Sequence, residues 1–326
     1  MKSPLIRHPA NPILSSRDIP YDASLIFNAG VCKFQGEYIM LFRDDYGATR
    51  EDFADPERKK SHPLKTTVGL ARSRDGIHWT PAPKPVFEMH DGEIWRVYDP
   101  RLSVVDGQPV LSFAMDTAHG LRGGIATTDD FERFTIRSLS VPDNRNMVVF
   151  PEKINGLYAR LERPMPVYSR AEFEQFDIWM SSSPDLVYWG DSELVLRTET
   201  VPWAGSKIGP AAPPIRTEKG WLTTFHAVRR SKDNLLGWEE GWRKVYFAGL
   251  MLLDLEDPSK VLAIAKEPLL EPEADYELDG FRGSVLFPGG MIAEPDGEVK
   301  IYYGAADTVE CLATASVDDL LRFVLA

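Results

Sequence analysis

The sequence has 326 residues, and its 43% apolar content is enough to form one sizeable hydrophobic core. Asp and Glu (49) outnumber Lys and Arg (37), and the net charge of −12 excludes nucleic acid and anionic membranes as main partners, because both attract basic proteins. The N-terminal segment has no signal-peptide core and no apolar run approaches the ~20 residues of a membrane span, so we expect a cytoplasmic protein.

An apolar strand that begins at a glycine recurs five times along the chain. Its copies are rich in aromatic and β-branched residues, which favour extended structure, and turn residues precede each one. In chain order these predicted strands span residues 36–43, 107–114, 156–163, 220–226 and 297–303. After each strand comes an acidic turn signature, at residues 73–79, 128–134, 183–189, 254–258 and 316–320. The order of strand and turn is the same in every copy.

Five matched units of roughly 60 residues predict an all-β fold, a five-bladed β-propeller with a central active-site channel, as one domain over residues 1–326. The alternative is a β-sandwich or a two-domain β protein, neither of which predicts five copies. Helical signals are few: Ser316–Leu325 is expected to form a capped terminal helix and Arg170–Gln175 a single turn. The polar stretch Tyr46–Lys60 is expected to be an exposed insertion loop within the first unit.

Asp99 is the first candidate for chemistry. A propeller gathers its functional groups at the centre, so charged residues within otherwise apolar inner strands are the ones of interest. Asp99 lies between Tyr98 and Pro100, and proline pushes the residue before it toward extended geometry. Partial burial beside aromatic groups would raise its pKa, which suits a general acid. The alternative is a turn aspartate that accepts backbone hydrogen bonds.

A second set combines cations and an amide beside residues expected to be buried: Arg145, Asn146, Arg163, Lys207 and His226. Buried charge is unfavourable unless it is compensated, so an anion should meet this set, and its donors suit phosphate or carboxylate. The sequence has no GxxxxGK[ST] or GxGxxG loop, which argues against a nucleotide. The alternative, which the residues leave open, is that the set forms structural salt bridges with Asp143, Glu152 and Glu162.

A third set, Asn28, Arg43 and Asp307, places hydrogen-bonding groups at strand ends in the first and last units, a mixture that suits sugar hydroxyls. No HExxH, EF-hand loop or other ligand spacing predicts a metal, and no GxSxG elbow predicts Ser/His/Asp catalysis. Cys32 and Cys311 form no CxxC pair and are expected to be buried free thiols.

Several longer segments are specific enough to compare with known families: FNAG at Phe27, VYDPR at Val97, VPDNRNMVVFPEKING at Val141, LERP at Leu161, KIGPAAPP at Lys207, GWLTTFHAV at Gly220, FPGGMI at Phe287 and IYYGAADTVECLATA at Ile301. Together they resemble glycoside hydrolase family 130, the β-mannoside phosphorylases, and most of all the 4-O-β-D-mannosyl-D-glucose phosphorylase branch of that family. The likeness extends from His8 to Ala315, which is nearly the whole chain.

The resemblance implies a five-bladed propeller and a role for each candidate residue. Asp99 would be the sole catalytic acid, and the second set would hold inorganic phosphate, a co-substrate, with no cofactor required. Asn28, Arg43 and Asp307 would contact the mannosyl unit. The other partner is a mannose-containing disaccharide or short oligosaccharide, and homo-oligomers are common in the family.

The mechanism implied is inverting. Phosphate would attack C1 of the β-mannosyl unit while Asp99 protonates the departing oxygen, through the mannose 3-hydroxyl, giving α-mannose 1-phosphate and glucose reversibly. An inverting hydrolase needs a second carboxylate to activate water, whereas phosphate is already a nucleophile. The alternatives are a β-mannosidase that uses water and a non-catalytic sugar-binding propeller. The sequence departs from the branch at Trp95-Arg96, 203–206 and 282–284, and these departures bear on the acceptor subsite rather than on the phosphate set.

Overall fold

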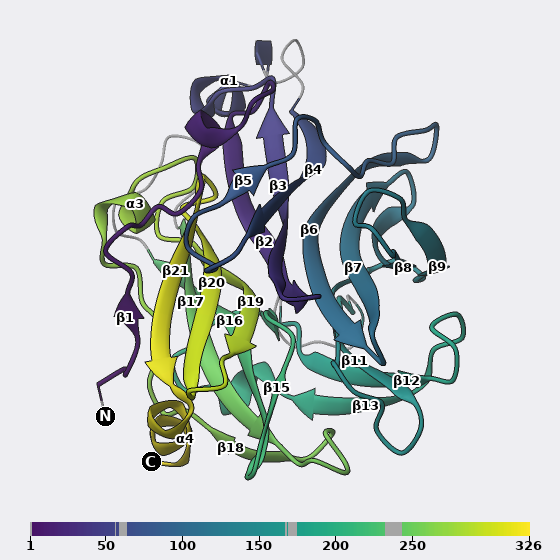
Figure 1. The fold of residues 1–326 in the computed structure, drawn as a ribbon, viewed down its shortest axis with the longest axis vertical. Coiled ribbons are helices and arrows are strands. Elements are labelled where there is room, and N and C mark those ends of the chain that lie inside the picture. The colour runs from purple at the N-terminus through teal and green to yellow at the C-terminus, as the bar shows by residue number, and fades with distance from the viewer. Residues whose placement is uncertain (1, 56, 59–63, 167, 169–174, 232–242) are drawn as a thin grey trace.

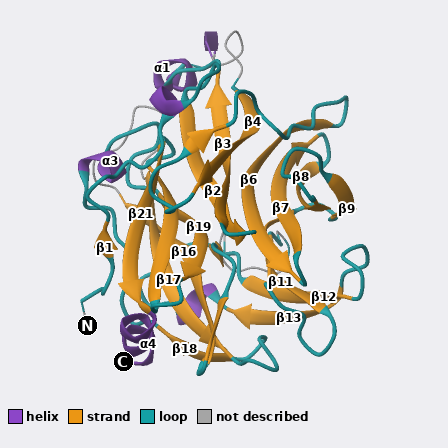
Figure 2. Cartoon of the chain, viewed as in Figure 1, coloured by secondary structure: helices purple, strands orange, loops and turns teal. Residues whose placement is uncertain are grey.

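Five antiparallel sheets surround a common centre in the computed structural model, which describes the chain except residues 1, 56, 59–63, 167, 169–174 and 232–242 (Figure 1). Each sheet is one blade, so the predicted five-bladed β-propeller is confirmed. Strands dominate the described chain, and its helices lie at the periphery (Figure 2). No helix in this described part is both long and apolar enough to span a membrane.

The blades follow one another along the chain. Blade 1 contains β2 (Leu25–Phe34), β3 (Glu37–Tyr46), β4 (Lys65–Ser73) and β5 (Thr80–Pro81). Blade 2 contains β6 (Ile94–Val105), β7 (Gln108–Thr117), β8 (Gly120–Thr127) and β9 (Thr135–Leu139). Blade 3 contains β10 (Asn144–Val149), β11 (Tyr158–Pro164), β12 (Ile178–Ser183) and β13 (Gly190–Leu196). Blade 4 contains β14 (Ile208–Pro210), β15 (Ile215–Thr217), β16 (Gly220–Ser231), β17 (Arg243–Leu253) and β18 (Val261–Ile264).

Blade 5 joins the two ends of the chain. It contains β19 (Leu286–Ala293), β20 (Glu298–Ala305), β21 (Val309–Ser316) and the N-terminal strand β1 (Ile6–Arg7). Strand β1 is its outermost strand and pairs antiparallel with β21, with Ile6 opposite Thr314. The ring is therefore closed by hydrogen bonds between strands from the beginning and the end of the sequence, which protects an edge that would otherwise be open.

The repeated strand of the sequence is the second strand of each blade: β3, β7, β11, β16 and β20. Its leading glycine lies in the turn that enters the strand and has positive φ in all five copies, from 79° to 147°, a conformation that side chains other than glycine rarely adopt. Four acidic signatures connect the third and fourth strands of their blades. The fifth begins α4 (Val317–Leu325), because β1 supplies the fourth strand of blade 5.

The helices agree in part with expectation. Helix α4 confirms the predicted terminal helix, with the Ser316 hydroxyl accepting from the Asp319 amide at 3.1 Å as an N-cap. The insertion after β3 contains α1 (Arg50–Ala54) where a loop was expected, and the turn predicted at 170–175 lies almost wholly outside the described residues. Other short helices of the described chain are η1 (Ser16–Asp18), η2 (Thr198–Thr200) and α3 (Asp275–Leu278).

The hydrophobic core lies between neighbouring blades rather than at the centre. One buried cluster joins blades 1 and 2, another joins blades 3 and 4, and a third joins blades 4 and 5. Cys32 and Cys311 are buried within such clusters and form no disulfide, as predicted. Because apolar packing fills the spaces between the blades, the centre of the ring is left to polar side chains.

Candidate active site

The innermost strand of every blade departs from regular pairing near the centre. The pairing register shifts in β2 after Phe27, in β6 after Tyr98, in β10 after Arg145 and in β19 after Pro288. In blade 4 the inner strand is divided into β14 and β15. A β-bulge of this kind bends its strand and redirects side chains, and bulges are frequent beside active sites.

Three of these bulges place a candidate residue in left-handed backbone geometry. The φ angles are 54° at Asn28, 52° at Asp99 and 58° at Asn146. The extended conformation expected at Asp99 from the following proline is therefore wrong, because the bulge in β6 imposes the other geometry. Positive φ is sparsely populated for residues other than glycine and is found at functional sites more often than elsewhere.

A cavity of about 340 Å³ lies at the centre of the ring. Its lining includes eight of the nine residues selected from the sequence: Asn28, Arg43, Asp99, Arg145, Asn146, Arg163, His226 and Asp307. The ninth, Lys207, does not line the cavity. It is buried immediately before β14, close enough to His226 to influence the pKa of that ring. Residues separated by more than 200 positions in the sequence thus share one site.

The expectation that these residues belong to inner strands holds only in part. Arg43, Arg163 and His226 lie on the second strands β3, β11 and β16, and Asp307 follows the second strand β20. The bulges account for this, because Arg43 pairs with Phe27 and Arg163 pairs with Arg145 just where the inner strand leaves its regular register. Side chains of the second strand then reach the cavity.

Asp99 lies within hydrogen-bond reach of two candidate residues. The Asn28 Nδ2 donates to Asp99 Oδ1 at 2.9 Å, and Arg43 Nη1 approaches the same oxygen at 3.3 Å. Arg43 is itself held by Asp45, with Nε to Oδ1 at 2.9 Å and Nη2 to Oδ2 at 2.6 Å. Burial acts to raise the pKa of Asp99, but Arg43, Arg101 and the Asn28 amide together hold that pKa below its usual value. The raised pKa expected from the sequence is therefore wrong for this structure, and Asp99 is ionised.

The basic group, Arg145, Arg163 and His226, lines the same cavity as Asp99 and is held by two separate sets of contacts. Arg145 Nη1 donates to the Tyr98 hydroxyl at 3.0 Å, and that hydroxyl donates to Asp116 Oδ1 at 2.6 Å. Arg163 Nη1 donates to His226 Nε2 at 2.8 Å. Gly209, opposite His226, leaves space for the ring, since a Cβ there would lie 2.5 Å from His226 Cε1.

His226 is neutral and does not add a cation to this group. Burial, together with the charges of Arg163, Lys207, Arg145 and Arg101, holds the pKa of His226 well below its usual 6.5. Because Nε2 accepts from the Arg163 guanidinium, the ring proton belongs on Nδ1. Nδ1 is buried and has no hydrogen-bond partner among the described residues, so it is a donor available to a ligand.

The alternative of structural salt bridges named three acidic residues, and each of them is engaged elsewhere. Glu162 pairs with Arg160 at 2.8 Å, Glu152 pairs with Arg216 at 2.9 Å, and Asp143 Oδ1 accepts from the backbone amide of Leu121 at 2.7 Å. None of these three contacts is with a member of the basic group.

Asp307 and Asp99 differ in their electrostatic surroundings. Burial raises the pKa of Asp307, and the nearby carboxylates of Asp99 and Asp45 act in the same direction, while Arg282 and Arg43 only partly oppose them. The closest approach of Arg282 is 3.8 Å, from Nε to Oδ2. Two carboxyl groups of one cavity whose pKa values are displaced in opposite directions are suited to different tasks.

Sequence reasoning did not select several other residues of the cavity. Tyr98 and Phe287 lie in quoted segments, yet they were interpreted only as neighbours, and Tyr246 lies in β17 without a motif. The His226 ring centre is 4.6 Å from that of Phe287 and 6.2 Å from that of Tyr246. The quoted segments could have indicated Tyr98 and Phe287, but no local signal indicated Tyr246.

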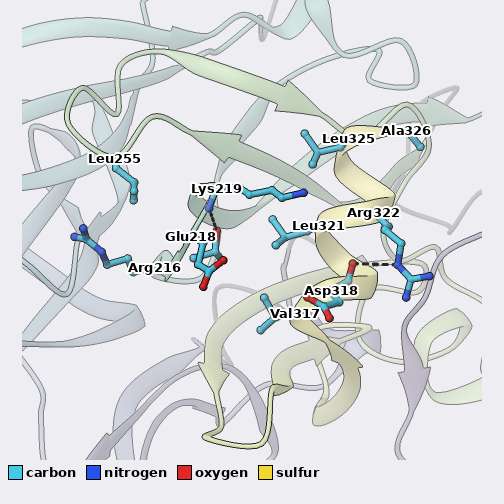
Figure 3. A pocket seen from close by; sticks show the side chains of 11 residues that line it. Arg216, Glu218, Lys219, Leu255, Val317, Asp318, Leu321, Arg322, Leu325 and Ala326 are labelled. Carbon is cyan, nitrogen blue, oxygen red and sulfur yellow. Dashed lines mark hydrogen bonds between the residues drawn. The ribbon is translucent and has the colours of Figure 1, made fainter.

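A second, larger cavity of about 1120 Å³ opens between α4 and the turn that connects β15 with β16 (Figure 3). Leu321, Leu325 and Lys219 are among the residues around it, and none of the nine candidates lines it. Its lining mixes aliphatic side chains with charged ones, of which Arg216 is paired with Glu152 at 2.9 Å. No group of three or more His, Cys, Asp or Glu side chains in the described chain could hold a metal ion.

Comparison with known proteins gives matches along nearly the full chain. The model of glycoside hydrolase family 130, described as beta-1,4-mannooligosaccharide phosphorylase, matches residues 15–325. A beta-1,2-mannobiose phosphorylase of Listeria innocua is 30% identical over 98% of both chains. A solved structure of the Listeria innocua beta-1,2-mannobiose phosphorylase, in complex with beta-1,2-mannobiose, has a TM-score of 0.82 at 29% identity and covers 98% of this chain and 99% of that one.

Two further relatives differ in the substrate for which they are named. A beta-1,4-mannooligosaccharide phosphorylase of Ruminococcus albus is 32% identical over 99% of this chain and 91% of its own length. A 4-O-beta-D-mannosyl-D-glucose phosphorylase of Bacteroides fragilis is 27% identical over 97% of this chain and 78% of its own length. The chain is thus less similar to the relative named for mannosylglucose than to those named for mannobiose or mannooligosaccharide.

Proposed function

This chain belongs to glycoside hydrolase family 130, and on that premise we propose that it cleaves β-1,4-mannosyl-glucose with inorganic phosphate to give α-mannose 1-phosphate and glucose, reversibly. The family resemblance inferred from the motifs is confirmed. The observation that carries the proposal is a basic group, with Arg145, Arg163 and the His226 donor, in the same cavity as the Asp99 carboxylate.

The basic group suits phosphate by its chemistry. Guanidinium groups present paired donors that match phosphate oxygens, and hydrogen bonds between charged partners are the strongest of their kind. The Nδ1 proton of neutral His226 adds a directional donor without adding charge. Fixed donors of this kind both bind phosphate and orient it for in-line attack on C1 of the sugar.

Asp99 is the proposed general acid, which requires a proton that it lacks in this structure. Its pKa is low mainly because the charges of Arg43 and Arg101 outweigh the effect of burial. Phosphate bound beside Arg145 would add negative charge to the cavity, and a nearby like charge raises the pKa of a carboxyl group. Phosphate binding would thus prepare Asp99 to protonate the departing oxygen, through the mannose 3-hydroxyl as the resemblance implies.

The mannosyl unit is proposed to lie against Asn28, Arg43 and Asp307, which line the cavity next to Asp99. The Asn28 amide and the Arg43 guanidinium already contact Asp99, so a sugar held by them would present its oxygen atoms to the acid. Glucose as the acceptor rests on the motif likeness to the mannosylglucose branch. Mannose is the rival acceptor, since the Listeria innocua and Ruminococcus albus relatives, which are more similar than the one named for mannosylglucose, are named for mannobiose and mannooligosaccharide.

The cavity disfavours the rival β-mannosidase. An inverting hydrolase uses a second carboxylate as base, with the two carboxyl groups ~6.5–9.5 Å apart. Of the other carboxylates that line the cavity, Asp45 is bound by Arg43 and Asp116 is bound by Arg96 at 2.6 Å. We place Asp307, whose pKa burial raises, against the mannosyl unit rather than against an attacking water molecule.

An assay with three disaccharides separates these functions. Mannosyl-β-1,4-glucose, β-1,4-mannobiose and β-1,2-mannobiose are each incubated with the protein, with and without phosphate, and both mannose 1-phosphate and free mannose are measured. We expect mannose 1-phosphate only with phosphate present, formed fastest from mannosylglucose. Equal release of free mannose with and without phosphate would establish the hydrolase instead. Turnover that is unchanged in Asp99→Asn would refute Asp99 as the acid.

A further inference from the structure

Arg101 is a buried residue beside the candidate active site, but it does not line the cavity. It follows the bulge that carries Asp99, and only 3% of its surface is exposed. Its Nε donates to the carbonyl oxygen of Ala211 at 2.7 Å, and its Nη1 donates to the carbonyl oxygens of Asn28 at 3.0 Å and Pro100 at 2.7 Å. The guanidinium lies 4.9 Å from the centre of the Phe287 ring.

These contacts join four of the five blades at the point where their inner strands are irregular. Asn28 lies in the bulge of β2, Pro100 in the bulge of β6, Ala211 directly after β14, and Phe287 in β19 beside its register shift. One side chain therefore holds the backbone irregularities that the quoted segments FNAG, YDPR, GPAAPP and FPGG encode. The roles expected for residues of those segments do not explain why the segments meet at Arg101.

Two glycines allow the segments to approach each other so closely. A Cβ on Gly30 would lie 2.7 Å from both the Arg101 Cα and the Pro100 carbonyl oxygen. A Cβ on Gly289 would lie 1.9 Å from the Ala29 carbonyl oxygen and 3.0 Å from Arg101 Nη1. Backbone atoms form most of these contacts, so the packing around Arg101 has little freedom to adjust.

The charge of Arg101 is retained despite its burial. Burial lowers the pKa of Arg101, but only to about 10, while Asp99 and the buried Glu310 act to raise it. Glu310 Oε2 accepts from the Ala29 amide at 3.1 Å, so it holds the other side of the bulge that contains Asn28. Arg101 and Glu310 thus fix the backbone from which the Asn28 amide reaches Asp99.

We propose that Arg101 is a positioning residue, which locks the bulges of blades 1 and 2 so that the Asn28 amide and the Asp99 carboxylate keep their geometry for catalysis. The catalytic effect in this proposal rests on the proposed function, whereas the contacts of Arg101 with the bulges do not depend on it. Arg101 also contributes positive charge that keeps Asp99 ionised in the absence of substrate. Lysine would keep the charge but could not make the same set of contacts, because it lacks the planar guanidinium fork.

The test compares Arg101→Lys and Arg101→Met with Lys300→Met. Lys300 is a suitable control because it is also a buried cation whose contacts join two blades, with Nζ donating to the Tyr38 hydroxyl at 3.3 Å and Glu294 at 3.2 Å, and it does not line the cavity. We expect kcat for cleavage of the β-mannoside to fall about 100-fold in both Arg101 variants, as for a misplacement of about 1 Å, with a smaller change in KM for phosphate. Lys300→Met should lose thermal stability and keep its kcat.

The pH profile separates the charge of Arg101 from its contacts. Asp99 must be protonated to act as an acid, so with saturating phosphate the alkaline limb of kcat/KM for the disaccharide follows the pKa of Asp99 in the phosphate complex. Losing a positive charge raises the pKa of a carboxyl group, so Arg101→Met should move that limb to higher pH. Arg101→Lys keeps the charge and loses only the effect of the Asn28 hydrogen bond, so it should move the limb less. A parental kcat in both folded Arg101 variants, or a kcat loss in Lys300→Met equal to theirs, would overturn the proposal.

A crystal structure of Arg101→Lys tests the proposal without any turnover. We expect the distance from Asn28 Nδ2 to Asp99 Oδ1 to exceed its present 2.9 Å by enough to break the hydrogen bond. An unchanged contact would refute the positioning role whatever reaction the protein catalyses. If instead the parent protein releases free mannose independently of phosphate, the proposed function fails while the geometry of Arg101 is still decided by this structure.

Discussion

The Tyr98 hydroxyl offers a sharp test of the residues proposed to bind phosphate, because it contacts Arg145 and has no part in the proposed reaction. It accepts from Arg145 Nη1 at 3.0 Å and donates to Asp116 at 2.6 Å. Burial raises the pKa of Tyr98 to about 12, so the hydroxyl keeps its proton throughout any practical assay. Tyr98→Phe removes both hydrogen bonds, while Asp116 keeps its 2.6 Å contact with Arg96.

The expected magnitude follows from the charge of the partners. A hydrogen bond to a charged group contributes about 1.5–3 kcal/mol, which corresponds to roughly a 10- to 150-fold change in an equilibrium constant. Arg145 would lose the hydrogen bond that holds its Nη1 in place. KM for phosphate should therefore rise by about tenfold or more within that range, with a smaller effect on kcat. Because Tyr98 does not ionise at assay pH, the ratio between parent and variant should be the same from pH 6 to pH 8.

Initial rates at varied phosphate concentration measure this effect, with Tyr302→Phe as the matched control. The Tyr302 hydroxyl is buried and donates to the Gly76 carbonyl oxygen at 2.9 Å, away from the cavity lining. Its loss should lower the free energy of unfolding by about 0.5–1.5 kcal/mol and leave KM for phosphate unchanged. An unchanged KM in folded Tyr98→Phe, or an equal rise in both variants, would refute the reasoning.

Three other predictions concern the centre of the ring. Gly289→Ala should lower the free energy of unfolding by about 3 kcal/mol or more, because its Cβ would overlap the Ala29 carbonyl oxygen at 1.9 Å, whereas Gly190→Ala, with open space at its Cβ, should be nearly neutral in thermal unfolding. Burial raises the pKa of Glu310 from 4.5 to about 8, so its contribution to stability is fully present below pH 4.5 and is lost as the pH rises through 8. Glu310→Gln should flatten this decline in melting temperature with pH, and an unaltered slope would contradict the assignment. The ring nitrogens of His226 should show no titration between pH 5.5 and pH 8 in NMR spectra. The free energy of unfolding should fall below pH 6.5, because only the unfolded chain then binds the proton. A titration midpoint of the His226 ring near 6.5 would contradict a neutral ring.

The number of blades could be predicted from sequence because its signals are local. A turn glycine, an apolar strand and an acidic turn each depend on neighbouring residues, and they recur five times. The inner strands could not be recognised in the same way. Bulges at Asn28, Asp99 and Asn146 interrupt their alternation, and β14 has only three residues. The pattern therefore marked the second strands. Eight of the nine candidate residues line one cavity, although some of them lie on other strands than expected.

The site could be predicted as a set of residues but not as an electrostatic arrangement. Asp99 and His226 stood out as polar groups beside apolar neighbours, which is a local signal. Their protonation depends on residues from other blades: Arg43 lowers the pKa of Asp99, and Arg163 lowers that of His226. Such effects require distances across the ring, and for the same reason the structural role of Arg101 was not apparent from YDPR alone.

The most direct measurement of the central claim is an NMR time course of mannosyl-β-1,4-glucose with phosphate and the parent protein. It follows the phosphorus signal of the product and the anomeric proton of its sugar. Attack by phosphate opposite the β-linked bond predicts that α-mannose 1-phosphate accumulates in step with free glucose. Appearance of the β-anomer, or of free mannose at a rate that does not depend on phosphate, would contradict the account.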